Sequence, residues 1–196
     1  MTSESEVLVA ARIEANRAFA AHTPPARNAI WWAMVIALIA IATISAAFVY
    51  SYFYLRLGAD SWPPPGTDLR SWELPLVALV AALVAGFVGL NADRPRVLLV
   101  VAAAIGGVAL GAQLFALVDS GHAIDANAYE ALVITIEGIA ALLLATAIAL
   151  RIAAIAFYRP PARPDGLHDA DAALWPGAIG LWSILWLIVH VAPRLI

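Results

Sequence analysis

The sequence contains no cysteine and no lysine, and charged residues make up only 13% of its 196 positions. The lack of cysteine excludes disulfides, thiolate catalysis, cysteine-ligated iron–sulfur clusters and copper–thiolate centres. The lack of lysine excludes Schiff-base chemistry, because all 11 basic side chains are arginines. The sequence also has no glycine-rich phosphate loop after a strand and no Ser/His/Asp constellation. The chain therefore offers few of the groups on which enzyme chemistry depends.

Apolar residues are correspondingly frequent in the sequence. They make up 63% of the chain, and the mean hydropathy is +0.87. A typical soluble domain is only about 45–50% apolar. The apolar runs are long and continuous, whereas barrel strands would alternate polar and apolar residues. The sequence therefore predicts an all-α integral membrane protein.

We expect five transmembrane helices in a bundle. The predicted spans are about 30–55, 74–91, 96–119, 128–158 and 172–192. The link 91–96 is short, so the second and third spans should form an antiparallel hairpin. Residues 29–196 then form one membrane domain. Residues 1–28 form a polar tail without a cleaved signal pattern, either a short amphipathic helix or a frayed end.

Arginine placement predicts the orientation in the membrane. Five spans put eight arginines at the end that holds the N-terminal tail and three at the other end. The first group is Arg12, Arg17, Arg27, Arg94, Arg96, Arg159, Arg163 and Arg151, the last reaching out from a span; the second is Arg56, Arg70 and Arg194. Positive charge favours the cytoplasmic side. The N-terminus is therefore predicted to be cytoplasmic and the C-terminus periplasmic, in a multi-pass protein of the bacterial inner membrane.

Glu137 is the one carboxylate well inside a predicted span. No arginine lies between Arg96 and Arg151, so we expect this side chain to find no local cation and to remain a neutral acid. A buried acid either handles protons or contacts a partner, or it stabilises packing through a hydrogen bond to a backbone carbonyl or to Gln113. Gln113, the other large polar side chain at depth, is expected to bond a neighbouring helix.

Small and aromatic residues predict packing and interface positions. Gly107 and Gly111, in step with Ala103, and also Gly138 would let a neighbouring helix approach closely. Lipid-interface positions are expected at Trp31, Trp32, Tyr52, Tyr54, Arg56 and Trp62.

The remaining titratable residues predict no cofactor site. Of the four histidines, only His190 lies near a span, so we expect no haem or metal ligand in this chain. His190 itself is expected at the interface, bonded to a C-terminal carbonyl. Asp169 or Asp171 is expected to cap the last helix.

One stretch resembles a known family. It combines Trp31-Trp32, an apolar helix, Ser51-Tyr52-Phe53-Tyr54-Leu55-Arg56 and Trp62-Pro63-Pro64-Pro65-Gly66. This combination resembles subunit III of the cytochrome c oxidase family, where it marks the first helix of five-helix members. Trp175 and Trp182 match the spacing of two tryptophans in the last helix of that family. Glu137 and Ala140 stand where the family's fourth-span pattern His-Gly-x-His has its histidines.

The resemblance implies a non-catalytic subunit of a respiratory haem–copper oxidase. Such a subunit binds phospholipid and supports assembly, proton uptake and stable turnover of the catalytic subunit I, alongside subunit II. Haem and copper would lie in these partner chains, and no nucleic acid is expected. The alternatives are an accessory subunit of a quinol oxidase or a nitric oxide reductase, or a stand-alone small membrane transporter.

The absence of cysteine allows a direct test of the predicted topology. A single cysteine introduced as Ala162→Cys should react with a membrane-impermeant maleimide only from the cytoplasmic side of oriented vesicles. Thr67→Cys should react only from the opposite side. Labelling of both positions from one side would mean that the number of spans is wrong by one.

Overall fold

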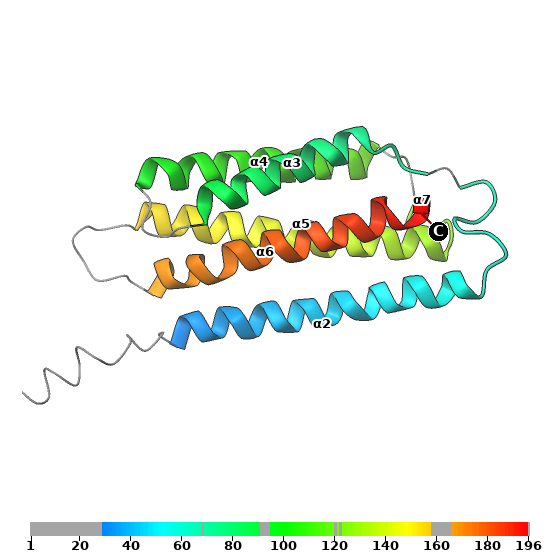
Figure 1. Ribbon diagram of the computed structural model, residues 1–196, viewed down its shortest axis with the longest axis horizontal. Coiled ribbons are helices and arrows are strands. Elements are labelled where there is room, and N and C mark those ends of the chain that lie inside the picture. The colour runs from blue at the N-terminus through cyan, green and yellow to red at the C-terminus, as the bar shows by residue number, and fades with distance from the viewer. Residues whose placement is uncertain are drawn as a thin grey trace, which may run out of the picture.

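The computed structural model describes residues 29–67, 69–90, 95–119, 121, 123–157 and 166–195. The amphipathic segment considered for residues 1–28 lies outside this part of the chain. Helix labels are those of Figure 1, beginning with α2.

The described chain is all-helical, as predicted, with five long helices and one single-turn helix. They are α2 (Ala29–Leu57), α3 (Glu73–Gly89), α4 (Arg96–Asp119), α5 (Ala128–Ala156), α6 (Gly166–His190) and α7 (Ala192–Leu195). Four segments are long and apolar enough to cross a membrane, namely α2, α4, α5 and 167–195. The 17 residues of α3 extend about 25 Å, which is short of a hydrocarbon core of about 30 Å.

The helices form three groups, which lie side by side in Figure 1. The hairpin of α3 and α4 lies on one side, α5 and α6 lie in the middle, and α2 runs along the other side. Among the described residues, α2 contacts α5 and α6 but neither α3 nor α4. Successive helices run antiparallel, so α7 lies at the opposite end from the start of α2 (Figure 1). The pair α5–α6 is therefore the centre to which the other helices attach.

Three tryptophans on α6 connect the central pair to the hairpin. The indole Nε1 of Trp175 donates to the carbonyl oxygen of Ala85 at 3.2 Å, and that of Trp186 donates to the carbonyl oxygen of Pro75 at 2.9 Å. Trp182 donates to the Gln113 side chain of α4. Apolar lipid provides little hydrophobic drive for helix association, so packing and hydrogen bonds of this kind fix helix positions.

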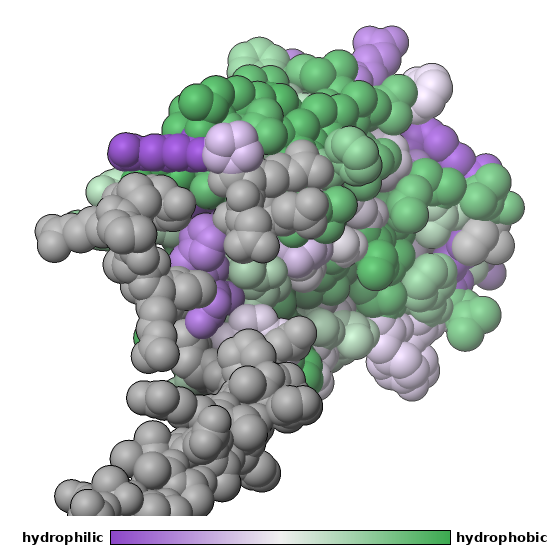
Figure 2. Space-filling view, turned by 60° about the vertical axis from the view of Figure 1, so that its left-hand side comes forward, coloured by the Kyte–Doolittle hydropathy of each residue, from purple (hydrophilic) through white to green (hydrophobic). Residues whose placement is uncertain are grey.

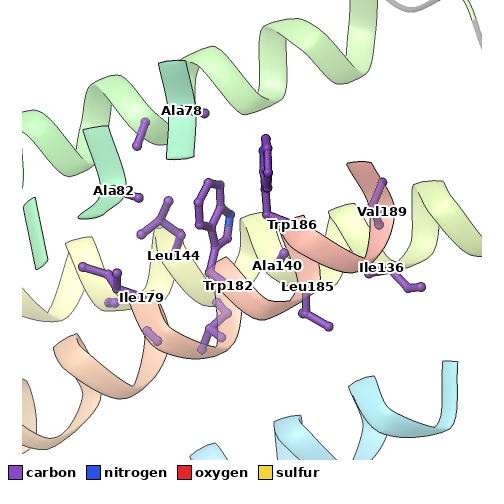
Figure 3. Packing of buried hydrophobic residues seen from close by; sticks show 14 of the residues in the cluster. Ala78, Ala82, Ile136, Ala140, Leu144, Ile179, Trp182, Leu185, Trp186 and Val189 are labelled. Carbon is purple, nitrogen blue, oxygen red and sulfur yellow. The ribbon is translucent and has the colours of Figure 1, made fainter. Parts of the chain in front are cut away.

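The core beneath these tryptophans alternates large and small side chains. Trp182 and Trp186 project from α6 toward the alanines Ala78 and Ala82 of α3 (Figure 3). The small α3 residues leave room for the indole rings, which are 0% and 8% exposed. Contact area and close packing are the main source of cohesion in such an interior.

A close approach joins α2 to α6 near Pro176, which lies inside α6. A Cβ atom added to the next residue, Gly177, would lie 2.5 Å from Cδ1 of Leu38 on α2. A larger residue than glycine would therefore fit at this position only if the Leu38 side chain moved. A proline inside a helix removes one backbone hydrogen bond, which membrane helices tolerate when neighbours pack against the site.

The outer surface of the bundle is largely apolar. Figure 2 shows hydrophobic residues over much of the visible flank. Exposed large side chains include Ile36 on α2, Phe87 on α3 and Val108 on α4, which are 60% exposed or more. Surfaces of this extent suit lipid tails or other membrane helices rather than water.

Arg151 forms a buried ion pair with Asp171 at the end of the bundle where α5 leads into α6. Its Nη2 lies 3.0 Å from Oδ2 of Asp171, and both side chains are 1% exposed. Nη2 also donates to the carbonyl oxygen of Gly89, and the guanidinium carbon lies 3.8 Å from the ring centre of Trp175. Arg151 thus joins α5, α6 and the last residue of α3.

Two predictions about this region are wrong. Arg151 does not extend toward the membrane surface, because a buried carboxylate neutralises it inside the bundle. Asp169 and Asp171 do not precede the last helix as caps, because α6 begins at Gly166. The earlier start places Asp171 inside the helix, on the face that meets Arg151.

The contact at Gly89 gives a stability test. A Cβ atom at this position would collide with the Arg151 guanidinium and lie 2.5 Å from Nε1 of Trp175. We expect Gly89→Ala to lower the free energy of unfolding by about 1–3 kcal/mol, as overpacking typically does. Thermal unfolding in detergent micelles measures the change. Gly107→Ala is the matched control, because its Cβ would meet nothing within 4 Å; equal losses in both variants would contradict the proposed contact.

Candidate functional site

A buried cluster of charged side chains lies at the end of the bundle that carries α7. Arg70, in the segment between α2 and α3, reaches two carboxylates of α5. Its Nη2 lies 3.0 Å from Oε2 of Glu130, and its Nη1 donates to Oε2 of Glu137. The three side chains are 8%, 1% and 10% exposed. One cation therefore serves two acids, which lie two helical turns apart on one face of α5.

The start of α5 positions the first of these acids. The Asn127 side chain accepts a hydrogen bond from the backbone N–H of Glu130 at 2.9 Å, which is an ordinary helix N-cap. The Asn127 amide also donates to the Thr67 hydroxyl at 3.1 Å. The segment that carries Arg70 is thus attached to the end of α5 that carries Glu130.

His190 and Arg194 complete the cluster from the C-terminal end. The His190 ring stacks on Trp186, and its Nε2 lies 3.6 Å from Oε1 of Glu137. Arg194 donates to the backbone carbonyl oxygens of His190 and Arg70, the second at 2.6 Å. His190 is 5% exposed, so it does not lie at the interface as predicted, although its Nδ1 does lie 3.2 Å from the Trp186 carbonyl oxygen.

Gln113 connects three helices beside this cluster. Its Nε2 donates to the backbone carbonyl oxygen of Glu137 on α5 at 3.1 Å, and its Oε1 accepts from Trp182 of α6 at 2.6 Å. The amide is therefore satisfied on both sides while buried. Its contact with Glu137 involves the backbone and leaves the carboxylate to Arg70.

Two hollows meet at Glu137 and His190. A groove of about 620 Å³ opens beside Arg70 and is also lined by Glu73 and Asp119. A small cavity of about 20 Å³ lies deeper, against Gln113 and Trp182. Glu137 and His190 line both spaces. The small cavity is large enough for about one water molecule.

The prediction that Glu137 finds no cation is wrong. Arg70 lies 67 positions from Glu137 in the sequence, yet its guanidinium donates directly to the Glu137 carboxylate. The prediction considered only the chain near Glu137, whereas antiparallel packing brings the segment before α3 onto the start of α5. Glu137 is therefore one of two acids that share the Arg70 cation, rather than an isolated acid.

Two of the expected lipid-interface positions face the protein interior. Tyr52 is 0% exposed. Trp62 packs edge-on against Tyr52 and against Tyr129 of α5, with ring centres 5.3 Å apart in both pairs. The interface prediction is wrong for Tyr52, and Trp62 is half-buried beside it, because the loop after α2 folds back onto the bundle. Trp32 and Tyr54 are 55% and 64% exposed, while Trp31 and Arg56 are half-buried.

The glycines expected to admit a close helix do not do so within the described part of the chain. A Cβ atom at Gly107, Gly111 or Gly138 would meet nothing within 4 Å. The helix contacts are instead made at Gly86, Gly89, Gly106 and Gly177. On α4 the neighbouring Gly106 therefore faces the bundle, whereas Gly107 and Gly111 face outward and Ala103 of the predicted stripe is buried.

The cluster supports charge and proton chemistry. Among the residues that the structure describes, no group of three or more His, Asp or Glu side chains is placed to hold a metal ion. Carboxylate, imidazole and guanidinium groups in contact can hold and redistribute protons. No protein-family model and no curated protein sequence matches this chain.

Sequence reasoning missed Arg70, Glu130 and the role of His190. The available signal was their position, since each lies at or near an end of a predicted span at the same end of the bundle. Opposite charges at one membrane level of different helices are candidates for pairing. The sequence alone did not show which helices are neighbours.

Removal of Arg70 should be strongly destabilising. In Arg70→Gln, Glu130 and Glu137 would lose their shared cation, and we expect a loss of about 3–5 kcal/mol in the free energy of unfolding. The triple variant Arg70→Gln, Glu130→Gln, Glu137→Gln removes all three charges together and should recover most of the loss. Chemical unfolding in micelles measures both.

Glu73→Gln is the matched control, because Glu73 lines the groove but is exposed. Its effect should stay within about 0.5 kcal/mol, as for most surface substitutions. If Arg70→Gln lowers the free energy of unfolding no more than this control does, the cluster does not stabilise the fold. The same conclusion would follow if the triple variant were the least stable of all.

Proposed function

We propose that this chain is a non-catalytic membrane subunit of a respiratory haem–copper oxidase, of the subunit III type with five transmembrane helices. It would support assembly and stable turnover of a catalytic subunit that carries haem and copper. Its place would be the bacterial inner membrane, with the N-terminus cytoplasmic and the C-terminus periplasmic.

The observation that carries this proposal is the packing of Trp62 on Tyr52. The two halves of the sequence resemblance are the aromatic end of α2 and the Trp-Pro-Pro-Pro-Gly stretch. In the structure these halves touch, with Trp62 held between Tyr52 and Tyr129. Because Tyr52 and Trp62 pack on each other, the two sequence patterns that contain them have a physical reason to occur together. The resemblance is thus supported as one unit rather than as two unrelated short matches.

The outer surface supports a partner-bound protein. In α2 the only buried side chains are Ser45 and Tyr52, although the helix has 29 residues. The open glycine positions Gly107 and Gly111 leave a smooth strip on the outer face of α4. A large apolar surface of this kind suits a neighbouring membrane subunit and bound phospholipid. Within the described part of the chain, the buried carboxylates Glu130, Glu137 and Asp171 pair with arginines of the same chain, as suits a structural role.

Purification from native membranes tests the proposal. An affinity-tagged chain extracted in mild detergent should bring out a large haem-bearing subunit, with an oxidase absorption spectrum and oxygen consumption. Activity with reduced cytochrome c or with a quinol would distinguish the cytochrome c oxidase from the alternative complexes.

A tagged membrane protein of similar size and abundance provides the control for non-specific recovery. A chain recovered only as a haem-free, single-chain particle under the same conditions would refute the oxidase assignment.

A further inference from the structure

The hydrogen position on the His190 ring follows from its surroundings. Nδ1 lies 3.2 Å from the carbonyl oxygen of Trp186. A carbonyl oxygen only accepts hydrogen bonds, so Nδ1 must carry the hydrogen for this contact to be favourable. In the neutral ring Nε2 is then an acceptor with a free lone pair. Among the described residues this nitrogen has no hydrogen-bond partner.

The atom facing Nε2 is also an acceptor. Oε1 of Glu137 lies 3.6 Å away, while Oε2 of the same carboxylate is held by Arg70. Two acceptors at this separation repel each other unless a hydrogen lies between them. One added proton, on either atom, converts the contact into a hydrogen bond after a small approach. Both residues are at least nine-tenths buried, so bulk solvent does not replace this partner.

The charges around the pair favour one added proton. Among the buried groups, one cation, Arg70, faces two carboxylates, Glu130 and Glu137. Without an added proton, these three side chains together carry one excess negative charge. The exposed groups nearby are Arg194 on α7, Glu73 on α3 and Asp119 on α4.

These exposed groups are screened by solvent and add one further negative charge in sum. On the α2 side, Tyr52 contacts Tyr129 of α5, with ring centres 6.1 Å apart. A buried cluster is most stable when its charges cancel.

A route for the proton is present. The groove of about 620 Å³ connects Glu137 and His190 with the polar groups at the end of the bundle, Arg70, Glu73 and Asp119. The cavity of about 20 Å³ behind the pair gives room for about one water molecule. The pair therefore lies between the polar groove and the small inner cavity.

We propose that Glu137 and His190 form a proton-exchange site that takes up one proton from the groove at the α7 end of the bundle and returns it there. The proton comes from an acid of the aqueous phase and binds between Oε1 of Glu137 and Nε2 of His190. No covalent bond between heavy atoms changes and no electron is transferred. Uptake brings the buried cluster to zero net charge, and release restores its negative charge. The site does not depend on the oxidase assignment, since all its groups belong to this chain.

Infrared difference spectroscopy tests the site directly. The full chain, reconstituted in phospholipid vesicles, is titrated from about pH 4 to about pH 9, which covers the ordinary range of carboxyl and imidazole groups. We expect a carboxylic acid carbonyl band that gives way to carboxylate bands as the pH rises. Glu137→Gln should abolish this band, and Glu73→Gln should leave it unchanged.

Nitrogen NMR of the chain labelled with ¹⁵N-histidine provides the second reading. The His190 signal, identified by its loss in His190→Asn, should keep a protonated Nδ1 throughout. Its Nε2 resonance should change with the same midpoint as the infrared band. Glu137→Asp, which keeps a carboxylate if Glu137→Gln fails to fold, should retain the band and move the midpoint by about one pH unit or more.

Three results would overturn the proposal. The first is the absence of any titrating band that Glu137→Gln removes. The second is an Nε2 resonance that stays constant over the whole range. The third is a band removed by Glu73→Gln instead. Failure to recover a haem-bearing partner would leave these readings unaffected, so the two proposals fail separately.

Discussion

The requirement that charge inside an apolar bundle be neutralised organises this structure. A side chain that ionises away from water needs a partner of opposite charge, and a chain with few charges has few ways to provide one. Arg151 with Asp171 meets the requirement at one end, and Arg70, shared by Glu130 and Glu137, meets it in part at the other. Each pairing joins segments that are distant in sequence. The two ends of the bundle are therefore fixed by charge, and the apolar middle by packing.

Between these ends, α6 sets the register of the helices. Its three indole groups bond to Ala85, Gln113 and Pro75, at three levels along the hairpin of α3 and α4. An indole has a large apolar body and a single donor, so it fills space and also selects one partner. A shift of α6 by one turn would leave three buried donors without acceptors. These hydrogen bonds thus specify the position of α6 along the hairpin, which apolar packing alone would not define.

The helices were predictable because their signal is local. Continuous apolar runs bounded by proline or charge gave the all-α fold and the bounds of most helices to within a few residues. The start of α6 was missed because Asp169 and Asp171 are polar, and Arg151, the partner of Asp171, lies 20 residues away. The site was predicted only in part, as Glu137 and Gln113. Its cation, Arg70, is 67 residues from Glu137, and only the neighbour relations of folded helices bring them together. The outward position of Gly107 and Gly111 was missed for the same reason, since spacing defines a stripe but not its direction.

The position of α2 has a consequence for biogenesis. Among the described helices it touches only α5 and α6, with a close contact at Gly177, although it is the first of them to be synthesised. It must therefore stay in the bilayer as a solitary helix while the hairpin of α3 and α4 is inserted. Its 29 uninterrupted helical residues can satisfy this condition without a protein neighbour. Arg70, in the segment between α2 and α3, must likewise remain unpaired with Glu130 until α5 has been translated. The last two helices to be inserted thus close a bundle whose first member is already in place.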